Sequence, residues 1–339
     1  MPKIIKLRSR ELFPTYRGDL IPKNIYVLAD QCDTEADIDV VIGTYNQPRE
    51  VNAAIENYLA LEKQARLHIW VVDDSHRPWA FTGIKKDPRV SRVLILNKVR
   101  ATDRRYAGNN WASNGASVAA QIGMNLGTAR YGFFSHTDMM GYKENFLSYL
   151  LSKMDADTPV AAFTQRHVFP FTGGMLYDKR NFAGLAVDWM PKQDNHYVIP
   201  GLEPFRDQVS HYASIDSGEQ IPLEAFQRGQ KAYICASRGI TGDYLGDPLN
   251  GYDFTKQAVM AAGAPVHFAP LNTDAEQFAR RYPELATPYN AMWRKSFDED
   301  GAVIFIHRGR GTTNRNQDDK RGDFFAFVEA FNARMGAAA

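Results

Sequence analysis

Short, mostly apolar runs alternate along this chain with stretches of helical periodicity. The apolar runs, typical of strands buried on both faces, occupy residues 38–42, 67–72, 93–96, 131–134, 160–164, 265–271 and 303–306. After the first run, Pro48 suits the first position of a helix, and Val51, Ile55 and Tyr58 follow at helical spacing. Strand and helix in alternation predict an α/β fold with a doubly wound, mostly parallel sheet flanked by helices.

Polar residues follow three of the predicted strands. In open α/β sheets the carboxyl ends of the strands form the ligand crevice, so these residues are expected to gather at one edge of the sheet. An imidazole and a carboxylate with one residue between them can meet a hydrated divalent cation or a sugar hydroxyl. The three groups are Thr44-Tyr45-Asn46, Asp73-Asp74 and His136-x-Asp138.

A purely structural interpretation of these residues is the alternative. Asn, Asp and Ser are common turn formers and helix caps, and an apolar helical face follows the last group from Phe146. For Asn46 and Ser75 we favour the structural role. For Asp74 and Asp138 together we favour function.

The composition and charge of the chain argue against several classes of protein. The 339 residues are 44% hydrophobic and 23% charged, with a formal net charge of +1, which argues against bulk nucleic-acid binding. Cys32 and Cys235 have no metal-binding spacing and fit a reducing compartment. No apolar core of a signal peptide and no run of about 18 apolar residues occurs, so a cytoplasmic protein without a transmembrane segment is expected.

The segments IDVVIGTYNQP, WVVDDS and NGASVAAQIGMNLGTARYGFFSHTD, in this order, resemble inverting glycosyltransferases of the family 2 type with a GT-A fold. The resemblance covers about residues 37–270. It implies transfer of a sugar from a nucleoside diphosphate donor, UDP foremost, to a hydroxyl acceptor. It further implies that Asp74, with Asp73 beside it, recognises the nucleotide base, and that Asp138 binds the metal bridging the donor diphosphate.

One position departs from the family pattern. His136 stands where the family usually has Asp. Imidazole suits Mg²⁺ poorly, whereas Mn²⁺ tolerates mixed ligands. The expected cofactor is a divalent metal, Mn²⁺ or Mg²⁺, and His136 either binds it or contacts the ribose or sugar of the donor.

A late strand at 303–306 ends in a basic segment that is expected to complete this site. His307 resembles the third metal ligand of many GT-A enzymes. Arg308 and Arg310 would hold the departing diphosphate through fixed positive charge; the alternative is a solvated basic loop. With the residues above, the expected donor-binding set is Thr44, Tyr45, Asn46, Asp73, Asp74, Arg105, Asn114, His136, Arg308 and Arg310.

Two further segments are expected on the acceptor side. Gly173 and Gly174 resemble the family's glycine-bearing segment beneath the acceptor, where small residues let the backbone approach a sugar; the alternative is an ordinary turn. Asp253, with Tyr252 in place of the family's Glu, resembles the general base that takes the proton of the acceptor hydroxyl. The alternative for Asp253 is a helix N-cap, and Asp247 and Asp243 are the reserve candidates.

The resemblance also implies how the chain is divided. Residues 187–250 would be an insertion shaping the acceptor pocket. The acceptor would be a glycan or another hydroxyl compound, consistent with polysaccharide biosynthesis, and the helix at 324–331 would pack or form a homodimer. The expected parts are an N-terminal extension (1–36, with a strand at 24–28), a catalytic domain (37–271, with a nucleotide half 37–140 and an acceptor half 160–271) and a C-terminal segment completing the site (272–339).

Other nucleotide-binding classes lack their motifs. No Gly-x-Gly-x-x-Gly follows a strand, which weakens a dinucleotide-dependent oxidoreductase, and no Gly-x-x-x-x-Gly-Lys-Ser/Thr occurs, which argues against a P-loop kinase. A sugar-nucleotide pyrophosphorylase would need a Gly-rich, basic loop after the first strand, and Gly43-Thr44-Tyr45 has none. A catalytically inactive nucleotide-sugar-binding protein is the other alternative, favoured by His136 and Tyr252 where acids are expected.

Overall fold

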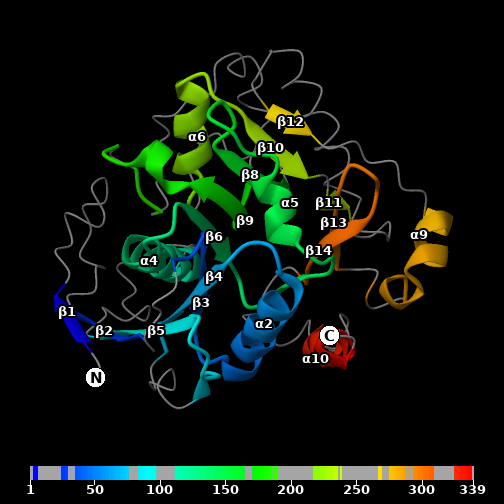
Figure 1. The fold of residues 1–339 in the computed structure, drawn as a ribbon, viewed down its shortest axis with the longest axis horizontal. Coiled ribbons are helices and arrows are strands. Elements are labelled where there is room, and N and C mark those ends of the chain that lie inside the picture. Colours follow the sequence, from blue (N-terminus) through cyan, green and yellow to red (C-terminus); the bar gives the residue numbers. More distant parts are fainter. Residues whose placement is uncertain are drawn as a thin grey trace.

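A large central sheet organises the chain. The computed structural model describes residues 3–6, 24–29, 35–75, 83–96, 111–164, 170–185, 187–189, 217–235, 237–238, 266–268, 275–287, 290, 293–308 and 324–337. The strands of the large sheet are β1 (Lys3–Lys6), β2 (Asn24–Ala29), β3 (Ile38–Thr44), β4 (Leu67–Asp73), β5 (Val90–Leu96), β6 (Tyr131–Ser135), β8 (Val160–Thr164), β9 (Pro170–Asp178), β10 (Ala232–Cys235) and β12 (Val266–Phe268). Within the described residues this sheet has ten strands in the order β1-β2-β5-β4-β3-β6-β9-β8-β10-β12 (Figure 1).

Most of these strands run in one direction. β5, β4, β3 and β6 pair in parallel, and β8, β10 and β12 form a second parallel group. β9 runs antiparallel between β6 and β8, and β2 pairs antiparallel with β5. Each run of residues expected to form a strand does so, with bounds shifted by a few residues. Their apolar, β-branched composition suits strands that are covered on both faces.

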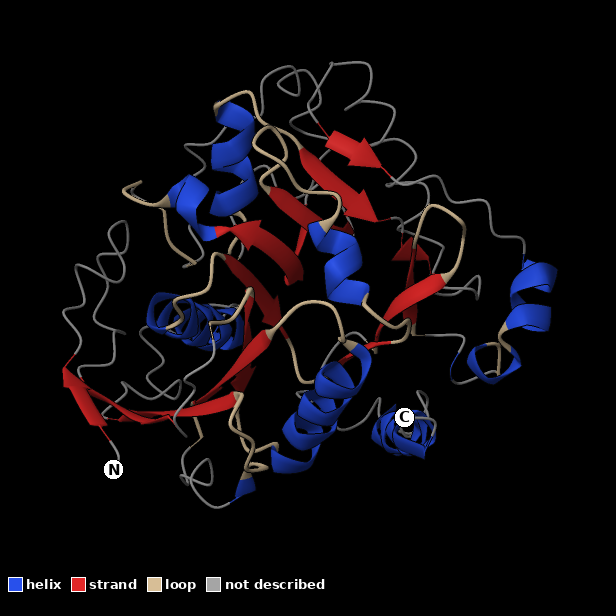
Figure 2. Ribbon diagram, in the orientation of Figure 1, coloured by secondary structure: helices blue, strands red, loops and turns tan. Residues whose placement is uncertain are grey.

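Helices cover both faces of the sheet (Figure 2). One face packs against α2 (Pro48–Leu61) and α5 (Phe146–Leu151), and the other against α4 (Trp111–Leu126) and α6 (Gln220–Gln227). The helix α10 (Phe324–Ala337) packs against α2. The remaining helices are α9 (Ala275–Arg281) and the 3₁₀ turns η1 (Lys179–Phe182) and η3 (Pro283–Leu285). The doubly wound, mostly parallel α/β fold expected from the sequence is confirmed. None of the helices in the described ranges is long and apolar enough to cross a membrane.

A buried carboxylate ties β3 to its surroundings. Asp39 is the second residue of β3 and is fully buried. It accepts hydrogen bonds from Trp70 Nε1 at 3.0 Å and from the backbone nitrogen of Ala129 at 2.8 Å, and it pairs with Lys179 Nζ at 2.6 Å. A buried charge is tolerated when it is paired and fully hydrogen-bonded, so this network fixes the amino end of β3 against its neighbours.

A second, smaller sheet joins the middle of the chain to its C-terminal part. Its strands are β11 (Ser237–Arg238), β13 (Arg294–Phe297), β14 (Val303–His307) and β7 (Met139–Gly141), in that order. The helix expected from Phe146 forms as α5, but β7 lies between it and Asp138 and pairs antiparallel with β14. Because the two strands pair, residues near 138 and 307 are brought together.

Candidate metal and nucleotide site

Three strand ends meet at one edge of the large sheet. β3 lies between β4 and β6, and the register pairs Thr44 with Asp73 and Ile42 with Ser135. The segments that follow these strands therefore leave the sheet side by side. This is the edge at which open α/β sheets bind ligands.

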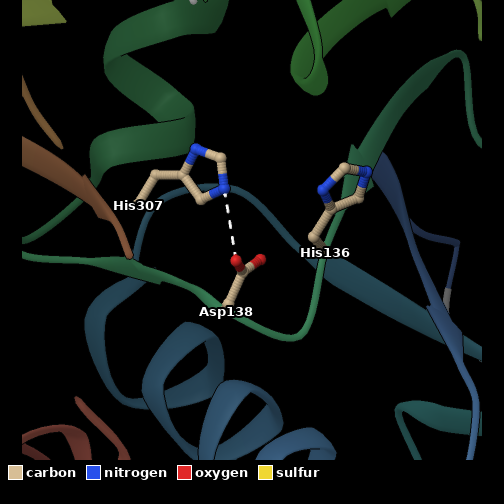
Figure 3. A group of neighbouring side chains, drawn as sticks. All are labelled: His136, Asp138 and His307. Atoms are coloured by element: carbon tan, nitrogen blue, oxygen red, sulfur yellow. Dashed lines mark ion pairs between the residues drawn. The ribbon is translucent and has the colours of Figure 1, made fainter. Parts of the chain in front are cut away.

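His136, Asp138 and His307 form a cluster at this edge (Figure 3). One ligand atom from each residue can be chosen so that all three lie within 4.8 Å of one another. His307 Nε2 lies 3.4 Å from Asp138 Oδ2, and the centroids of the two imidazole rings are 6.2 Å apart. Asp138 is 3% exposed and His307 is 6% exposed, while His136 is half-buried. The sequence predicted these three residues as metal ligands, and the structure brings them together.

The pairing of β7 with β14 explains why a residue so distant in sequence reaches this place. His307 is the register partner of Met139, and the backbone nitrogen of Arg308 donates to the carbonyl oxygen of Asp138 at 3.0 Å. On the other side, His136 packs edge-on against Phe134, with ring centroids 5.4 Å apart. His307 thus lies in a strand, and His136 and Asp138 lie in the short turn that joins β6 to β7.

The hydroxyl of Ser135 helps to fix the backbone that carries His136. Ser135 Oγ donates to the carbonyl oxygen of His136 at 3.0 Å and lies 2.5 Å from Tyr58 Oη on α2. Burial, opposed in part by this hydrogen bond, raises the pKa of Tyr58, so the phenol stays protonated. The α2 helix therefore supports the His136 segment directly.

Asp138 is ionised in this environment. Burial by itself would raise the pKa of its carboxyl group, but His307, and behind it His136, outweigh burial and hold the pKa well below its usual range. Within the described residues, Asp138 Oδ2 accepts no hydrogen bond. An ionised, buried carboxylate oxygen facing two imidazoles fits a divalent cation, and a set of two nitrogens and one oxygen suits a transition metal better than Mg²⁺.

The structural alternative for Asp138 is wrong. The residue that precedes α5 is Asn145, with a left-handed φ of 58°, and β7 separates it from Asp138. Asp138 therefore does not cap α5.

The turn after β3 is held by the turn after β4. The backbone nitrogen of Asn46 donates to Ser75 Oγ at 2.7 Å, and that of Asp74 donates to the carbonyl oxygen of Thr44 at 2.9 Å. Asn46 has a φ of 56°, which Asn tolerates better than most residues. These contacts agree with the structural role favoured for Asn46 and Ser75.

The two aspartates that end β4 have different surroundings. Asp73 is fully buried, and its Oδ1 accepts a hydrogen bond from the backbone nitrogen of Ser75 at 2.8 Å, so it orders the turn. Asp74 is half-buried, and its Oδ2 would lie 3.5 Å from a Cβ placed on Gly115 in the first turns of α4. Tyr45, on the neighbouring turn, is 41% exposed. Of the pair, Asp74 is the more exposed.

Arg308 is buried, so the alternative interpretation of this residue as part of a solvated basic loop is wrong. Its guanidinium lies 5.8 Å from the ring centroid of Phe325 on α10. Its backbone hydrogen bond to Asp138 keeps it beside the cluster. A role in holding a diphosphate stays a prediction.

The two glycines on the expected acceptor side lie inside β9, so the alternative of an ordinary turn is wrong. Gly174 is buried, and a Cβ there would lie 2.6 Å from Phe163 Cδ2. Close packing of the neighbouring strand is therefore enough to require glycine at this position. Contact with an acceptor stays a prediction.

Several predicted residues lie outside the described part of the chain. Asn114 belongs to α4, but its side chain is outside the described residues. The three candidate general bases, the neighbouring tyrosine and two arginines lie wholly outside the described residues, so their roles stay predictions. These residues are Asp243, Asp247, Asp253, Tyr252, Arg105 and Arg310.

Two polar residues that support the site were not predicted. Asn57 of α2 is fully buried and binds the backbone of β7. Gln47 accepts a hydrogen bond from Thr137, which stands between His136 and Asp138. Asn57 could have been noticed in the sequence because it is an amide on the otherwise apolar face of a predicted helix. Gln47 carried no such signal, because a glutamine before a helix is unremarkable in sequence.

Comparisons with known proteins find similarity to glycosyltransferases at the level of structure. No protein-family model matches the chain, and no curated protein sequence matches it. A mannosyltransferase from Pyrobaculum calidifontis, solved in complex with GDP-Man and Mn²⁺, is 10% identical over 51% of this chain and 50% of its own, with a TM-score of 0.34. TarS from S. aureus in complex with UDP is 11% identical over 45% of this chain and 50% of its own, with a TM-score of 0.33.

A third solved structure matches more of the chain. The glycosyltransferase GlyE from Streptococcus pneumoniae TIGR4 is 11% identical over 74% of this chain and 64% of its own, with a TM-score of 0.35. The matches to the first two proteins span about half of their length. Scores this low carry no argument about activity, so the function of this chain is argued from its own residues.

Proposed function

We propose that this protein is a glycosyltransferase that moves a sugar from a nucleoside diphosphate donor to a hydroxyl acceptor. The observation that carries the proposal is the cluster of His136, Asp138 and His307, which lies at the carboxyl edge of a doubly wound sheet. The ends of β3 and β4, with Tyr45 and Asp74, adjoin it in the same sheet. A metal-binding cluster beside strand ends that suit a nucleotide is the arrangement that a metal-bound diphosphate requires.

Each residue has a separate task in this proposal. His136, Asp138 and His307 would hold Mn²⁺ in preference to Mg²⁺, and when bound the metal would supply positive charge that stabilises a departing diphosphate. Asp74 would bind the nucleotide base, uracil foremost. Arg308 would add a fixed positive charge beside the cluster.

The transfer itself would be a single displacement. The acceptor hydroxyl gives its proton to a general base, its oxygen forms a bond to the anomeric carbon, and the bond from that carbon to the diphosphate oxygen breaks. The nucleoside diphosphate leaves with the bonding electrons, and the configuration at the anomeric carbon inverts. Asp253 is the proposed base, with Asp247 as the reserve, and both lie outside the described residues.

The ligand set itself favours a second candidate. Two imidazoles and one carboxylate also bind Fe(II) in non-haem oxygenases, where open coordination positions accept dioxygen and substrate. The strand ends beside the cluster favour the glycosyltransferase over the oxygenase, because Tyr45 and Asp74 would have a role in binding a nucleotide and none in an oxygenase. Fe(II) nevertheless belongs among the metals tested.

The test is a thermal-shift panel. UDP, GDP, TDP and CMP are each added with Mn²⁺, Mg²⁺, Fe(II) or EDTA to the full chain. A nucleotide at about 100 times its dissociation constant stabilises the native state by about 2.7 kcal/mol, which is easily measured. We expect a Mn²⁺-dependent shift with one nucleoside diphosphate that is lost in Asp138→Ala.

Other results of the panel would change the proposal. A shift with Fe(II) alone and none with nucleotides would favour the oxygenase. A nucleotide shift without detectable sugar transfer to any acceptor would favour a catalytically inactive binding protein. No shift with any nucleotide would remove the donor site from the proposal.

A further inference from the structure

Gln47 lies at the start of α2 but does not cap it. It occupies the N-cap position, yet its side chain makes no capping hydrogen bond. Instead, its Oε1 accepts a hydrogen bond from Thr137 Oγ1 at 2.8 Å. Thr137 stands between His136 and Asp138, so the amide of Gln47 is fastened to the segment that carries two of the proposed metal ligands.

The nitrogen of the same amide has no partner among the described residues. The bond from Thr137 uses the oxygen Oε1 and leaves Nε2 for another acceptor. Gln47 Nε2 is buried and has no hydrogen-bond partner within the described structure, although an amide nitrogen carries two donor hydrogens. Buried donors in native proteins almost always have a partner, so an absent one is informative.

Two further polar atoms at the same edge share this property. Thr44 Oγ1, three residues before Gln47 and in a residue that is 5% exposed, makes no hydrogen bond among the described residues. Asp138 Oδ2 makes none there either, although it lies 3.4 Å from His307 Nε2. The three atoms come from β3, from the turn that follows it, and from the segment after β6. Separate segments that leave polar atoms unsatisfied at one edge point to a polar ligand there.

The chemistry of these atoms limits what the ligand is. The amide nitrogen can only donate, so it needs an acceptor oxygen, and Asp138 lies in the cluster with His136 and His307 that could hold a metal ion. A phosphate group bound to a divalent metal offers both, because its oxygens accept hydrogen bonds while the metal meets the carboxylate.

We propose that Gln47 is a substrate-binding residue whose Nε2 donates a hydrogen bond to a phosphate oxygen of the nucleoside diphosphate. The proposal rests on the proposed function and adds a specific contact to it. Thr137 acts through Gln47 as a positioning residue, because its hydroxyl donates to the oxygen of the amide. The competing explanation is that Gln47 only links α2 to the segment 136–138.

The variant that separates these explanations is Gln47→Glu. A glutamate keeps an oxygen that can accept the hydrogen bond from Thr137, and it replaces the donor with a carboxylate oxygen that repels phosphate. Binding of UDP, GDP and TDP in the presence of Mn²⁺, and of Mn²⁺ alone, is measured by calorimetry on the full chain. We expect the dissociation constant of the bound nucleotide to rise about tenfold or more, while Mn²⁺ alone binds at least as tightly as in the wild type.

A merely structural role predicts a different pattern. If Gln47 only links the two segments, Gln47→Glu leaves the affinity for nucleotide unchanged, and that result overturns the proposal. Gln47→Met, which has a similar size and no donor, replaces the glutamate variant if the latter does not fold, and the same loss of nucleotide affinity is expected. Thr137→Val, which keeps the amide but removes its anchor, should weaken nucleotide binding less than either.

The experiment also distinguishes failure of this inference from failure of the proposed function. If the wild type binds Mn²⁺ but no nucleoside diphosphate, both the proposed donor site and the proposed Gln47 contact are wrong. If the wild type binds a nucleoside diphosphate and Gln47→Glu and Gln47→Met bind it equally well, only the Gln47 contact is wrong.

Discussion

The side chain of Asn57 pairs with the backbone of Gly141 through both of its polar atoms. Asn57 Nδ2 donates to the carbonyl oxygen of Gly141 at 3.1 Å, and Asn57 Oδ1 accepts from the backbone nitrogen of Gly141 at 2.7 Å. Asn57 Nδ2 also reaches Asn332 Oδ1 at 3.1 Å, and Asn332 Nδ2 donates to the carbonyl oxygen of Ala53 at 3.0 Å. A buried chain of amides thus connects α10, α2 and β7. Because β7 follows Asp138 directly and pairs with the strand of His307, Asn57 sets the geometry of the cluster.

Asn57→Ala is expected to weaken metal binding. The substitution leaves the nitrogen and oxygen of Gly141 buried and unsatisfied, at a cost of about 1–3 kcal/mol for each group. Loss of partners that support metal ligands typically lowers metal affinity about 10–100-fold, and we expect the dissociation constant of Mn²⁺ to rise by about tenfold or more. Calorimetric titration with Mn²⁺ measures this, together with urea denaturation for stability.

Asn332→Ala is the matched control. It removes the other half of the amide chain and should also lower the free energy of unfolding, but it leaves both bonds between Asn57 and Gly141 intact. Its affinity for Mn²⁺ should stay within about twofold of the wild type, since the support of the ligands is untouched. Equal losses of metal affinity in both variants would mean that Asn57 acts through global stability.

His136→Asp is expected to change the preferred metal. The proposed set of two imidazoles and one carboxylate would favour Mn²⁺, whereas a second carboxylate oxygen suits the harder Mg²⁺. We expect the ratio of Mg²⁺ to Mn²⁺ affinity to rise about tenfold. Competition between the two ions, followed by the electron paramagnetic resonance of free Mn²⁺, gives this ratio. An unchanged ratio would remove His136 from the ligand set.

Gly174→Ala is expected to destabilise the fold through Phe163. The new Cβ would lie 2.6 Å from Phe163 Cδ2, and that ring already stacks on Phe305 with centroids 4.4 Å apart. Overpacking of this kind costs about 1–3 kcal/mol. Phe163→Leu should recover part of the loss in the double variant, as measured by urea denaturation. If Gly174 served only the acceptor, its substitution would leave the free energy of unfolding unchanged.

Lys295 on β13 is expected to make stability depend on pH. The side chain is fully buried, its Nζ donates to the carbonyl oxygen of Asn290, and burial lowers the pKa of Lys295 from 10.5 to about 7. The unfolded chain then holds one more proton than the folded chain between these values. The free energy of unfolding should therefore rise with pH over that range, by up to about 1.4 kcal/mol per pH unit.

The variant Lys295→Met isolates this effect. At pH 7 methionine removes the cost of giving up a proton on folding, so the variant should be more stable than the wild type. The difference should shrink as the pH rises toward 10.5 and stay constant below 7. Thermal unfolding of both proteins from pH 6 to pH 10 tests this, and parallel stability curves would contradict it.

The parallel core of this fold could be predicted from the sequence because its signals are local. A buried strand such as Ile38–Thr44 can be predicted from its continuous apolar run, and the turn residues after it mark its end. The rule that ligands bind at the carboxyl ends of such strands then placed Asp74 and Asp138 at one edge. No knowledge of distant contacts was needed for either step.

The rest of the site depends on contacts that the sequence does not reveal. β7 has only three residues, so the sequence of the segment before α5 gave no sign of a strand. Its pairing with β14 joins parts of the chain that are far apart in sequence. Asn57 and Gln47 matter through the particular atoms that they meet, and residue type alone does not specify those partners. Propensity and periodicity describe local structure, so tertiary pairing of this kind escapes them.

The pairing of β7 with β14 has a consequence for how the protein is made. His136 and Asp138 leave the ribosome about 170 residues before His307, which at 5–20 residues per second is a delay of roughly ten to thirty seconds. During this interval β7 has no partner strand, and the two early ligands lack the third that would close the cluster. A metal that needs all three side chains would therefore bind only after synthesis of the C-terminal part, and a chain interrupted before Val303 would expose the unpaired edge of β7.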